Sequence, residues 1–298
     1  MNIQILKFES RHLPTIVRFL NEEYRKSHEF IPYTKERVLS QIRRRDLKIL
    51  VAEENGNVLG LVGTHLEERG EENISWLAAD EGPNRRIIEN TLVNEVEKNA
   101  KSDTVTTTIE EGSPRINDWI NRGYVLNLGW LRMSAKLDGP KPVPEVAEGI
   151  KLRTLRPDEE EKLIEVVNTG FEWQRLEPGD LETWKSEDPP FNEDWVQVAE
   201  IDERIVSAVV AKPDTDYNEY LHLNRGYLGP ATTLPEFRNK HLASALTAQA
   251  MNFLLEKGMN SVRLGTSEQN VYSITLLRSL GFQVDIVRKI LRKKLKDV

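Results

Sequence analysis

A short basic loop in front of a predicted helix is the stretch whose residue types point most directly to chemistry. An apolar run over residues 227–234 predicts a strand, and Leu242 opens a pattern of apolar residues at helical spacing. Arg238 and Lys240 lie between the two. A helix N-terminus carries unpaired backbone N–H groups and the positive end of the helix dipole, so further cations there are mildly unfavourable unless an anion is bound. This loop therefore predicts a phosphate-binding site.

The residues that follow complete a strand–loop–helix–strand–helix unit. Lys257-Gly258 is typical of a helix end, and residues 261–266 predict a second strand. A second helix then runs to Leu280-Gly281. Asn270 stands before that helix, where its side chain would cap the first turn.

Two segments of this unit resemble motifs of the GNAT N-acetyltransferases. Residues 234–243 (LPEFRNKHLA) resemble the pyrophosphate loop of that family, and residues 270–282 resemble its Asn-x-x-Ala…Leu-Gly-Phe segment. The resemblance implies acetyl-CoA as co-substrate, with the pyrophosphate on the loop and the pantetheine arm along the preceding strand. The residues implied to bind the coenzyme are Thr232, Thr233, Leu234, Arg238, Asn239, Lys240, His241, Leu242, Ala243, Asn270 and Ser273.

Simpler roles exist for some of these residues. Thr232 and Thr233 are also ordinary strand formers, and Asn270 and Ser273 would also serve as a helix cap and a packing residue. The sequence departs from the family pattern at His241, which replaces the usual first glycine of the loop.

The general acid and the general base have candidates rather than assignments. Leu277 stands where many family members have a tyrosine that protonates the leaving thiolate, and Tyr272, one turn earlier, is the substitute candidate. Tyr227 lies closest to the position of the family's usual basic Glu. Glu172 lies beside Trp173 in the segment that covers the acceptor in the family, where an acidic, aromatic surface would suit a cationic amine. Each is equally well explained as an ordinary strand or surface residue.

The order of predicted elements occurs twice in the chain. Between the two copies, residues 139–148 contain alternating prolines and predict an extended linker. The predicted fold is α/β (α+β): two tandem GNAT-like domains, each a mixed, mostly antiparallel sheet flanked by helices. The first domain is predicted over residues 1–138 and the second over residues 149–298.

The first copy lacks a convincing phosphate loop. Its corresponding loop, residues 80–86, begins with Asp80 and Glu81 and contains Pro83, which has no N–H to donate. We therefore predict a degenerate first domain that packs, shapes the acceptor site or dimerises. Arg85 and Arg86 keep open the alternative that it also binds the coenzyme.

Composition excludes several classes of protein. The chain has no cysteine and five scattered histidines, which argues against disulfides, a thiol nucleophile and a metal site. A net charge of −7 argues against nucleic acid as the main partner. The basic run 288–296 is predicted to be a strand with a solvated basic face, with a nucleic-acid patch as the alternative. Without a signal-peptide pattern or a membrane-spanning apolar run, a cytoplasmic location and no membrane partner are expected.

The leading prediction is an acetyl-CoA-dependent N-acyltransferase. It would move an acetyl group to the primary amine of a small molecule or peptide by direct attack, in the C-terminal domain, as a monomer or homodimer. The alternative is a non-catalytic acyl-CoA-binding or regulatory module of the same fold, which Leu277 and His241 favour.

Overall fold

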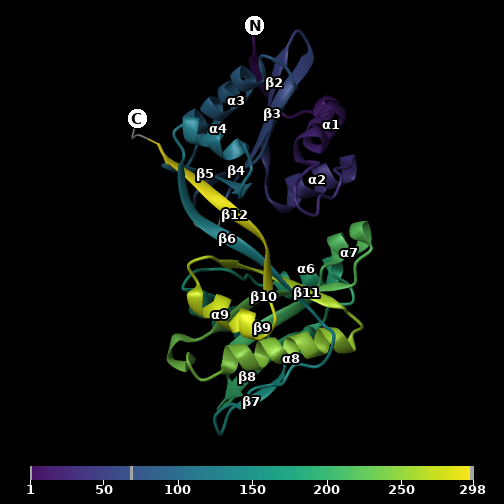
Figure 1. Ribbon diagram of the computed structural model, residues 1–298, viewed down its shortest axis with the longest axis vertical. Coiled ribbons are helices and arrows are strands. Elements are labelled where there is room, and N and C mark those ends of the chain that lie inside the picture. The colour runs from purple at the N-terminus through teal and green to yellow at the C-terminus, as the bar shows by residue number, and fades with distance from the viewer. Residues whose placement is uncertain (1, 68–69, 296–298) are drawn as a thin grey trace. The chain divides into compact units, whose positions relative to one another are not determined.

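The computed structural model describes residues 2–67 and 70–295, and the chain divides into two compact units. The first unit takes the described residues of 1–129 together with those of 287–298. The second unit takes residues 130–286. Within each unit, helices pack against hydrogen-bonded strands (Figure 1).

Strands of the first unit pair in the order β1-β2-β3-β4-β5-β12. The β4–β5 pair is parallel, and the other described pairs are antiparallel. The strands are β1 (Gln4–Lys7), β2 (Lys48–Glu54), β3 (Asn57–Leu66), β4 (Glu72–Ala79), β5 (Thr104–Glu110) and β12 (Gln283–Lys294). The helices are η1 (Ser10–His12), α1 (Leu13–Tyr24), α2 (Lys35–Arg44), α3 (Arg85–Asn99) and α4 (Arg115–Asn121).

Helices cover both faces of these strands. Leu61 and Trp76 belong to a buried cluster with α1 and α2, whereas the next residues, Val62 and Leu77, belong to a second cluster with α3 and α4. Successive side chains of a strand point to opposite faces. Therefore α1 and α2 lie on one face of the strands, and α3 and α4 lie on the other.

The second unit repeats this plan. Its strands pair in the order β6-β11-β10-β9-β8-β7, and of its described pairs only β10–β11 is parallel. The strands are β6 (Val125–Lys136), β7 (Lys151–Thr154), β8 (Val196–Ile201), β9 (Arg204–Pro213), β10 (Arg225–Thr233) and β11 (Ser261–Ser267). The helices are α5 (Glu160–Phe171), α6 (Asp180–Glu187), η2 (Glu193–Trp195), α7 (Thr215–Leu221), η3 (Pro235–Phe237), α8 (Leu242–Glu256) and α9 (Val271–Ser279). Two mixed, mostly antiparallel sets of strands flanked by helices were predicted, and this is confirmed.

The last strand of each half of the sequence pairs inside the other unit. Residues 130–136 of β6 pair with β11, and residues 288–294 of β12 pair with β5. The unit boundaries therefore fall at 129/130 and 286/287, and differ from the predicted domains 1–138 and 149–298. The physical reason is that the two halves share one element order, so each closing strand finds an equivalent free strand edge in the other half.

The proline-rich segment predicted as a linker, residues 139–148, lies in the second unit and contains no helix or strand. It is attached to α8, because the backbone N–H of Lys141 donates to the Asn252 side chain at 2.6 Å and the Asn252 amide donates to the Lys141 carbonyl at 2.9 Å. The segment thus has no regular secondary structure and is held to α8 at one point.

The basic run near the C-terminus forms β12, in agreement with the strand prediction. Its cations lie beside carboxylates: Lys293 contacts Glu97 at 2.6 Å, Lys289 contacts Glu111 at 3.3 Å, and Arg292 pairs with Glu71. Lys296, the last cation of the predicted run, lies outside the described residues. Among the described helices, none is both long and apolar enough to cross a membrane.

Candidate functional site

The parallel strands β10 and β11 separate soon after they begin. They pair over Arg225–Ser261, Gly226–Val262 and Tyr227–Arg263, and the described pairing ends there. On its other side β10 pairs with β9 and has one extra residue between Leu228 and Ala231. A bulge leaves part of the strand outside the regular ladder. The second unit therefore has a gap between two parallel strands, with irregular backbone along one side.

The predicted coenzyme loop lies at the end of β10. It passes through η3 and enters α8, a helix of 15 residues in which Leu246, Ala250 and Leu254 are fully buried. His241 is the N-cap of α8, and its side chain makes no capping hydrogen bond. The first intrahelical amide is that of Ala245, which donates to His241. The amides of the first turn therefore face outward from a firmly packed helix, as a phosphate site requires.

His241 has the backbone conformation that glycine adopts most easily. Its φ is 61°, and that of Asn239 is 64°, both in the left-handed region that favours glycine. Histidine and asparagine are among the other residues that enter this region most readily. His241 is exposed. The loop thus has a left-handed backbone at a position where the sequence resemblance implies a glycine.

The two basic side chains of the loop have different surroundings. Arg238 donates to the carbonyl of Gly170 at 3.1 Å and to that of Thr233 at 3.4 Å, so it ties the loop to α5. Lys240 lies over the Phe237 ring at 4.9 Å. Arg238 is therefore a structural brace as well as a positive charge.

The residues predicted to line the pantetheine arm are largely engaged with β9. The Leu234 N–H donates to Val206 at 3.0 Å, and the Thr232 carbonyl accepts from the Ser207 hydroxyl at 2.7 Å. Thr233 shares a hydrogen bond with the same hydroxyl at 2.8 Å. Coenzyme contact with the backbone of residues 232–234 stays a prediction. Residues 228–231 would suit such contact better, because they lie at the bulge of β10.

The helix after β11 begins as expected. Asn270 caps α9 by accepting a hydrogen bond from the Ser273 N–H at 3.1 Å. Tyr272, the substitute candidate for the general acid, is 88% exposed, and Leu277 is buried. Because an acid must come within hydrogen-bond reach of the thiolate, the exposure of Tyr272 argues against that role.

The surface around Glu172 differs from the acidic, aromatic surface that was predicted for a cationic amine. Glu172 is an exposed residue in left-handed conformation at the end of α5. The aromatic rings beside it, Phe171 and Trp173, lie 4.8 and 5.3 Å from the Arg175 guanidinium carbon. A cation of the protein itself therefore occupies the aromatic surface that was predicted for a cationic amine.

A polar cluster that the sequence did not predict lies where β10 and β11 begin. Tyr217 on α7 faces guanidinium groups from three strands, and Asp214 joins two of them. The cluster consists of Arg132, Asp214, Tyr217, Arg225 and Arg263. These residues are scattered through the sequence, and α7 itself was not predicted, so no local pattern connects them.

The first unit has an equivalent gap. Its strands β4 and β5 pair in parallel from Glu72–Val105 to Ile74–Thr107, and β4 has one extra residue between Ile74 and Trp76. After that point the described pairing ends, as in the second unit.

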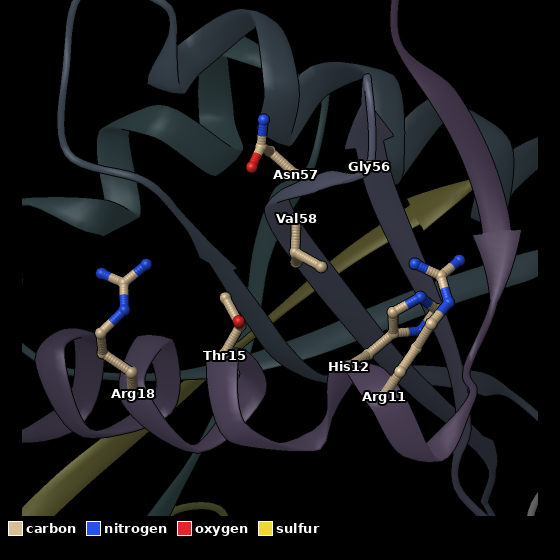
Figure 2. A pocket seen from close by; sticks show the side chains of 7 residues that line it. All are labelled: Arg11, His12, Thr15, Arg18, Gly56, Asn57 and Val58. Carbon is tan, nitrogen blue, oxygen red and sulfur yellow. The ribbon is translucent and has the colours of Figure 1, made fainter.

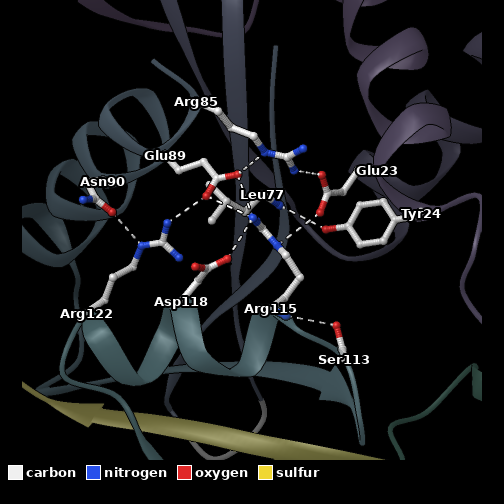
Figure 3. Close-up of polar contacts among 10 residues, drawn as sticks. All are labelled: Glu23, Tyr24, Leu77, Arg85, Glu89, Asn90, Ser113, Arg115, Asp118 and Arg122. Carbon is white, nitrogen blue, oxygen red and sulfur yellow. Dashed lines mark hydrogen bonds and ion pairs between the residues drawn. The ribbon is translucent and has the colours of Figure 1, made fainter. Parts of the chain in front are cut away.

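An ion-pair cluster occupies this gap in the first unit (Figure 3). Glu89 of α3, only 2% exposed, pairs with Arg85 at 2.9 Å, Arg115 at 2.9 Å and Arg122 at 2.8 Å. Burial by itself would raise the pKa of Glu89, but the charges of Arg115 and Arg85 hold it below its usual value. Glu23 of α1 also pairs with Arg85, and with Arg115 at 3.3 Å. Because α1 lies on the other face from α3 and α4, these pairs join the two faces where the strands separate.

A polar pocket of about 380 Å³ lies at the opposite end of α1 (Figure 2). It is lined by Arg11, His12, Thr15, Arg18, Gly56, Asn57 and Val58. Glu53 lies 2.6 Å from Arg11 and 3.4 Å from the buried His12 ring. The charges of the pocket are therefore compensated within the protein, and it is not our candidate site.

Known proteins are similar to the region of the chain that contains this loop. The acetyltransferase (GNAT) family model matches residues 154–282. The mycothiol acetyltransferase of Thermobispora bispora is 30% identical over 158 residues, which are 51% of this chain and 52% of the relative. That of Rhodococcus erythropolis is 27% identical over 175 residues, 51% of this chain and 53% of the relative. The chain thus spans about half the length of these relatives.

Solved structures are similar over the whole chain. A GCN5-related N-acetyltransferase from Sphaerobacter thermophilus has a TM-score of 0.72 at 18% identity and covers 99% of this chain and 96% of its own. A tandem GNAT protein from the clavulanic acid biosynthesis pathway has a TM-score of 0.70 at 15% identity, with full coverage of both chains. The fold of both units is therefore that of these proteins.

Proposed function

We propose that this protein transfers an acetyl group from acetyl-CoA to a primary amine in its second unit, because residues 154–282 match the acetyltransferase (GNAT) family model and the fold of both units is that of GNAT proteins. The acceptor is a small molecule or peptide. The amine attacks the thioester carbonyl directly, which needs no cysteine, and the chain has none. Amides at the start of α8 hold the pyrophosphate.

One observation carries the choice of the second unit. Helices α1 and α5 both have 12 residues, and α3 and α8 both have 15, so their positions can be matched by counting. Three charged residues of the ion-pair cluster in the first unit then match uncharged residues in the second unit. Glu23 corresponds to Gly170, Arg85 to Leu242 and Glu89 to Leu246.

This difference has a direct consequence for coenzyme binding. A pantetheine arm entering between β4 and β5 would have to displace a nearly buried carboxylate from three arginines. Removing one partner from a buried ion pair costs about 3–5 kcal/mol. The second unit has no such cost at the matching positions. We therefore infer one acetyl-CoA site per chain.

Calorimetric titration of acetyl-CoA tests this proposal. Lys240 and Lys257 form a matched pair, since each lies over a phenylalanine ring at about 5 Å and they flank opposite ends of α8. We expect one site per chain in the wild type, binding weakened roughly tenfold or more by Lys240→Glu, and wild-type binding in Lys257→Glu. Two sites per chain, or equal loss in both variants, would contradict the proposed location.

Turnover separates the enzyme from the alternative of an acyl-CoA-binding module. The buried Leu277, at the position of the family's usual acid, is the observation that favours the module. Release of free CoA thiol should be measured over a panel of primary amines. We expect amine-dependent release. Coenzyme binding without turnover on any amine would favour the module.

A further inference from the structure

Tyr217 is surrounded by arginines from three strands. Its ring centroid lies 3.9 Å from the guanidinium carbon of Arg263 on β11, 5.2 Å from that of Arg225 on β10 and 5.6 Å from that of Arg132 on β6. The ring is half-buried. A phenol in such a position has its negative, deprotonated form stabilised by nearby charge.

The short helix that carries Tyr217 is firmly attached. Asp214, its N-cap, accepts hydrogen bonds from Nη2 of Arg263 at 2.7 Å and from Nε of Arg225 at 2.7 Å. It also forms an ion pair with Nε of Arg263 at 2.6 Å. Asn218 donates to the Arg225 carbonyl at 2.8 Å and accepts from its N–H at 2.9 Å. These bonds fix α7 to the start of β10, and the three arginines hold the Tyr217 ring beside it.

That position is close to the gap between β10 and β11. Arg263 is paired with Tyr227 on the last parallel rung before the strands separate. Its guanidinium carbon lies 3.9 Å from the Tyr217 ring and 5.9 Å from the Tyr227 ring. Tyr217 therefore lies beside the residues from which the gap opens, and a thioester held in that gap would be nearby.

We propose that the Tyr217 phenolate is the base that takes a proton from the acceptor amine, a role that rests on the acetyl transfer proposed above. The ammonium group gives one proton to the phenolate oxygen. The freed nitrogen lone pair then forms a bond to the thioester carbonyl carbon, and the carbon–sulfur bond breaks. The second nitrogen proton goes to the departing thiolate, and Tyr217 returns its own proton to water.

The charges around Tyr217 support this role. Burial by itself would raise the pKa of the Tyr217 hydroxyl, but the charges and hydrogen bonds of Arg132 and Arg263 lower it. The negative charge of Asp214 opposes the effect of these arginines on Tyr217, but Asp214 is already paired with Arg225 and Arg263. Nearby, Asp188 bonds Thr215 of α7 and also pairs with Lys212 at 2.9 Å. The same positive surroundings lower the pKa of a bound amine, which further favours the reactive neutral form.

Tyr217→Phe is the decisive variant, because it keeps the ring beside the arginines and removes only the hydroxyl with its hydrogen bonds. The matched control is Tyr220→Phe on the same helix. We expect kcat/KM for acetyl transfer to fall by about 10²–10⁴-fold in Tyr217→Phe, as for loss of a general base, and to stay near wild type in the control. Acetyl-CoA binding by calorimetry should be unchanged in both.

Two further readouts distinguish a base from a structural tyrosine. In the wild type kcat/KM should rise with pH as Tyr217 ionises, and Arg132→Gln should move this rise to higher pH. The acceptor amine ionises at the same pH with every variant. A shift of the pH profile between variants therefore reports the ionisation of a group on the enzyme. The near-ultraviolet phenolate absorbance of wild type minus Tyr217→Phe should show a tyrosine that ionises below the usual pH.

The outcomes are separable. If the wild type transfers acetyl groups and Tyr217→Phe matches Tyr220→Phe in rate and pH profile, the role of Tyr217 is wrong and the transferase proposal stands. If the wild type binds acetyl-CoA without turnover on any amine, both proposals fail.

Discussion

The hydroxyl of Tyr24 accepts a hydrogen bond from the backbone N–H of Leu77 at 3.1 Å. Leu77 lies on β4 beyond its parallel pairing with β5, where the strand would otherwise offer amides to a ligand. Tyr24 is the last residue of α1, and the residue before it, Glu23, belongs to the ion-pair cluster (Figure 3). The end of one helix therefore supplies both a charge and a backbone partner to the gap of the first unit.

Tyr24→Phe should destabilise the protein without changing acetyl-CoA binding. The Leu77 N–H is buried and would lose its partner, which costs about 1–3 kcal/mol. A lower melting temperature is the measurement. Tyr272→Phe, which removes an exposed hydroxyl, is the control and should melt like the wild type. A second acetyl-CoA site in Tyr24→Phe would show that the first unit binds coenzyme once this amide is free.

Gly170→Ala should disturb the contact between α5 and β10. A Cβ at this position would overlap the Thr232 side-chain oxygen. We expect a loss of about 1–3 kcal/mol in unfolding free energy, measured by denaturant titration, because the helix must move or the core must strain. Gly82→Ala, where a Cβ meets open space, should be neutral.

Removing the obstructing oxygen should restore part of this loss. The double variant Gly170→Ala with Thr232→Ala should be more stable than the sum of the single changes predicts. Strict additivity of the two changes would show that the overlap is relieved elsewhere.

The left-handed backbone at residue 241 should be required for coenzyme binding. His241→Gly is expected to bind acetyl-CoA at least as well as the wild type, because glycine adopts a positive φ at no steric cost. His241→Val should bind more weakly, because a β-branched residue strongly disfavours that conformation. The test is calorimetry on both variants. If the His241→Gly and His241→Val variants bind acetyl-CoA with equal affinity, the loop does not bind the coenzyme through its backbone.

Glu159 should contribute to stability in a pH-dependent way. It precedes α5 and accepts hydrogen bonds from Arg153 at 2.7 and 2.9 Å. Burial by itself would raise the pKa of Glu159, but these bonds and that from the Arg156 N–H lower it to about 2. A carboxyl whose pKa is lower in the folded state than in the unfolded state stabilises the fold when the pH is above its unfolded-state pKa, near 4.5. This contribution to stability is lost as the pH falls toward 2.

Glu159→Gln should therefore be less stable than the wild type at neutral pH, with a difference that narrows between pH 4.5 and 2. Melting temperatures across this range are the measurement. Glu161→Gln, an exposed position on the same helix, is the control. If the difference in melting temperature does not change with pH, Glu159 does not contribute to the loss of stability in acid.

Features with local causes could be predicted from the sequence. The apolar spacing of α8, the Asn270 cap and the basic loop depend on residues close to one another in the chain, and all are present at the predicted positions. An Asn-Gly pair favours a tight hairpin turn, and Asn55 and Gly56, which join β2 to β3, both have the positive φ that such a turn requires.

Tertiary structure decided the features that depend on distant residues. The exchange of β6 and β12 depends on which strand edges are free, and two similar halves offer two equivalent answers to the same local pattern. The filled gap of the first unit joins Glu23, Glu89 and Arg115, which lie on three separate helices. The arginines around Tyr217 likewise come from three strands. Local periodicity determines which elements form, whereas only their packing determines which charged side chains meet.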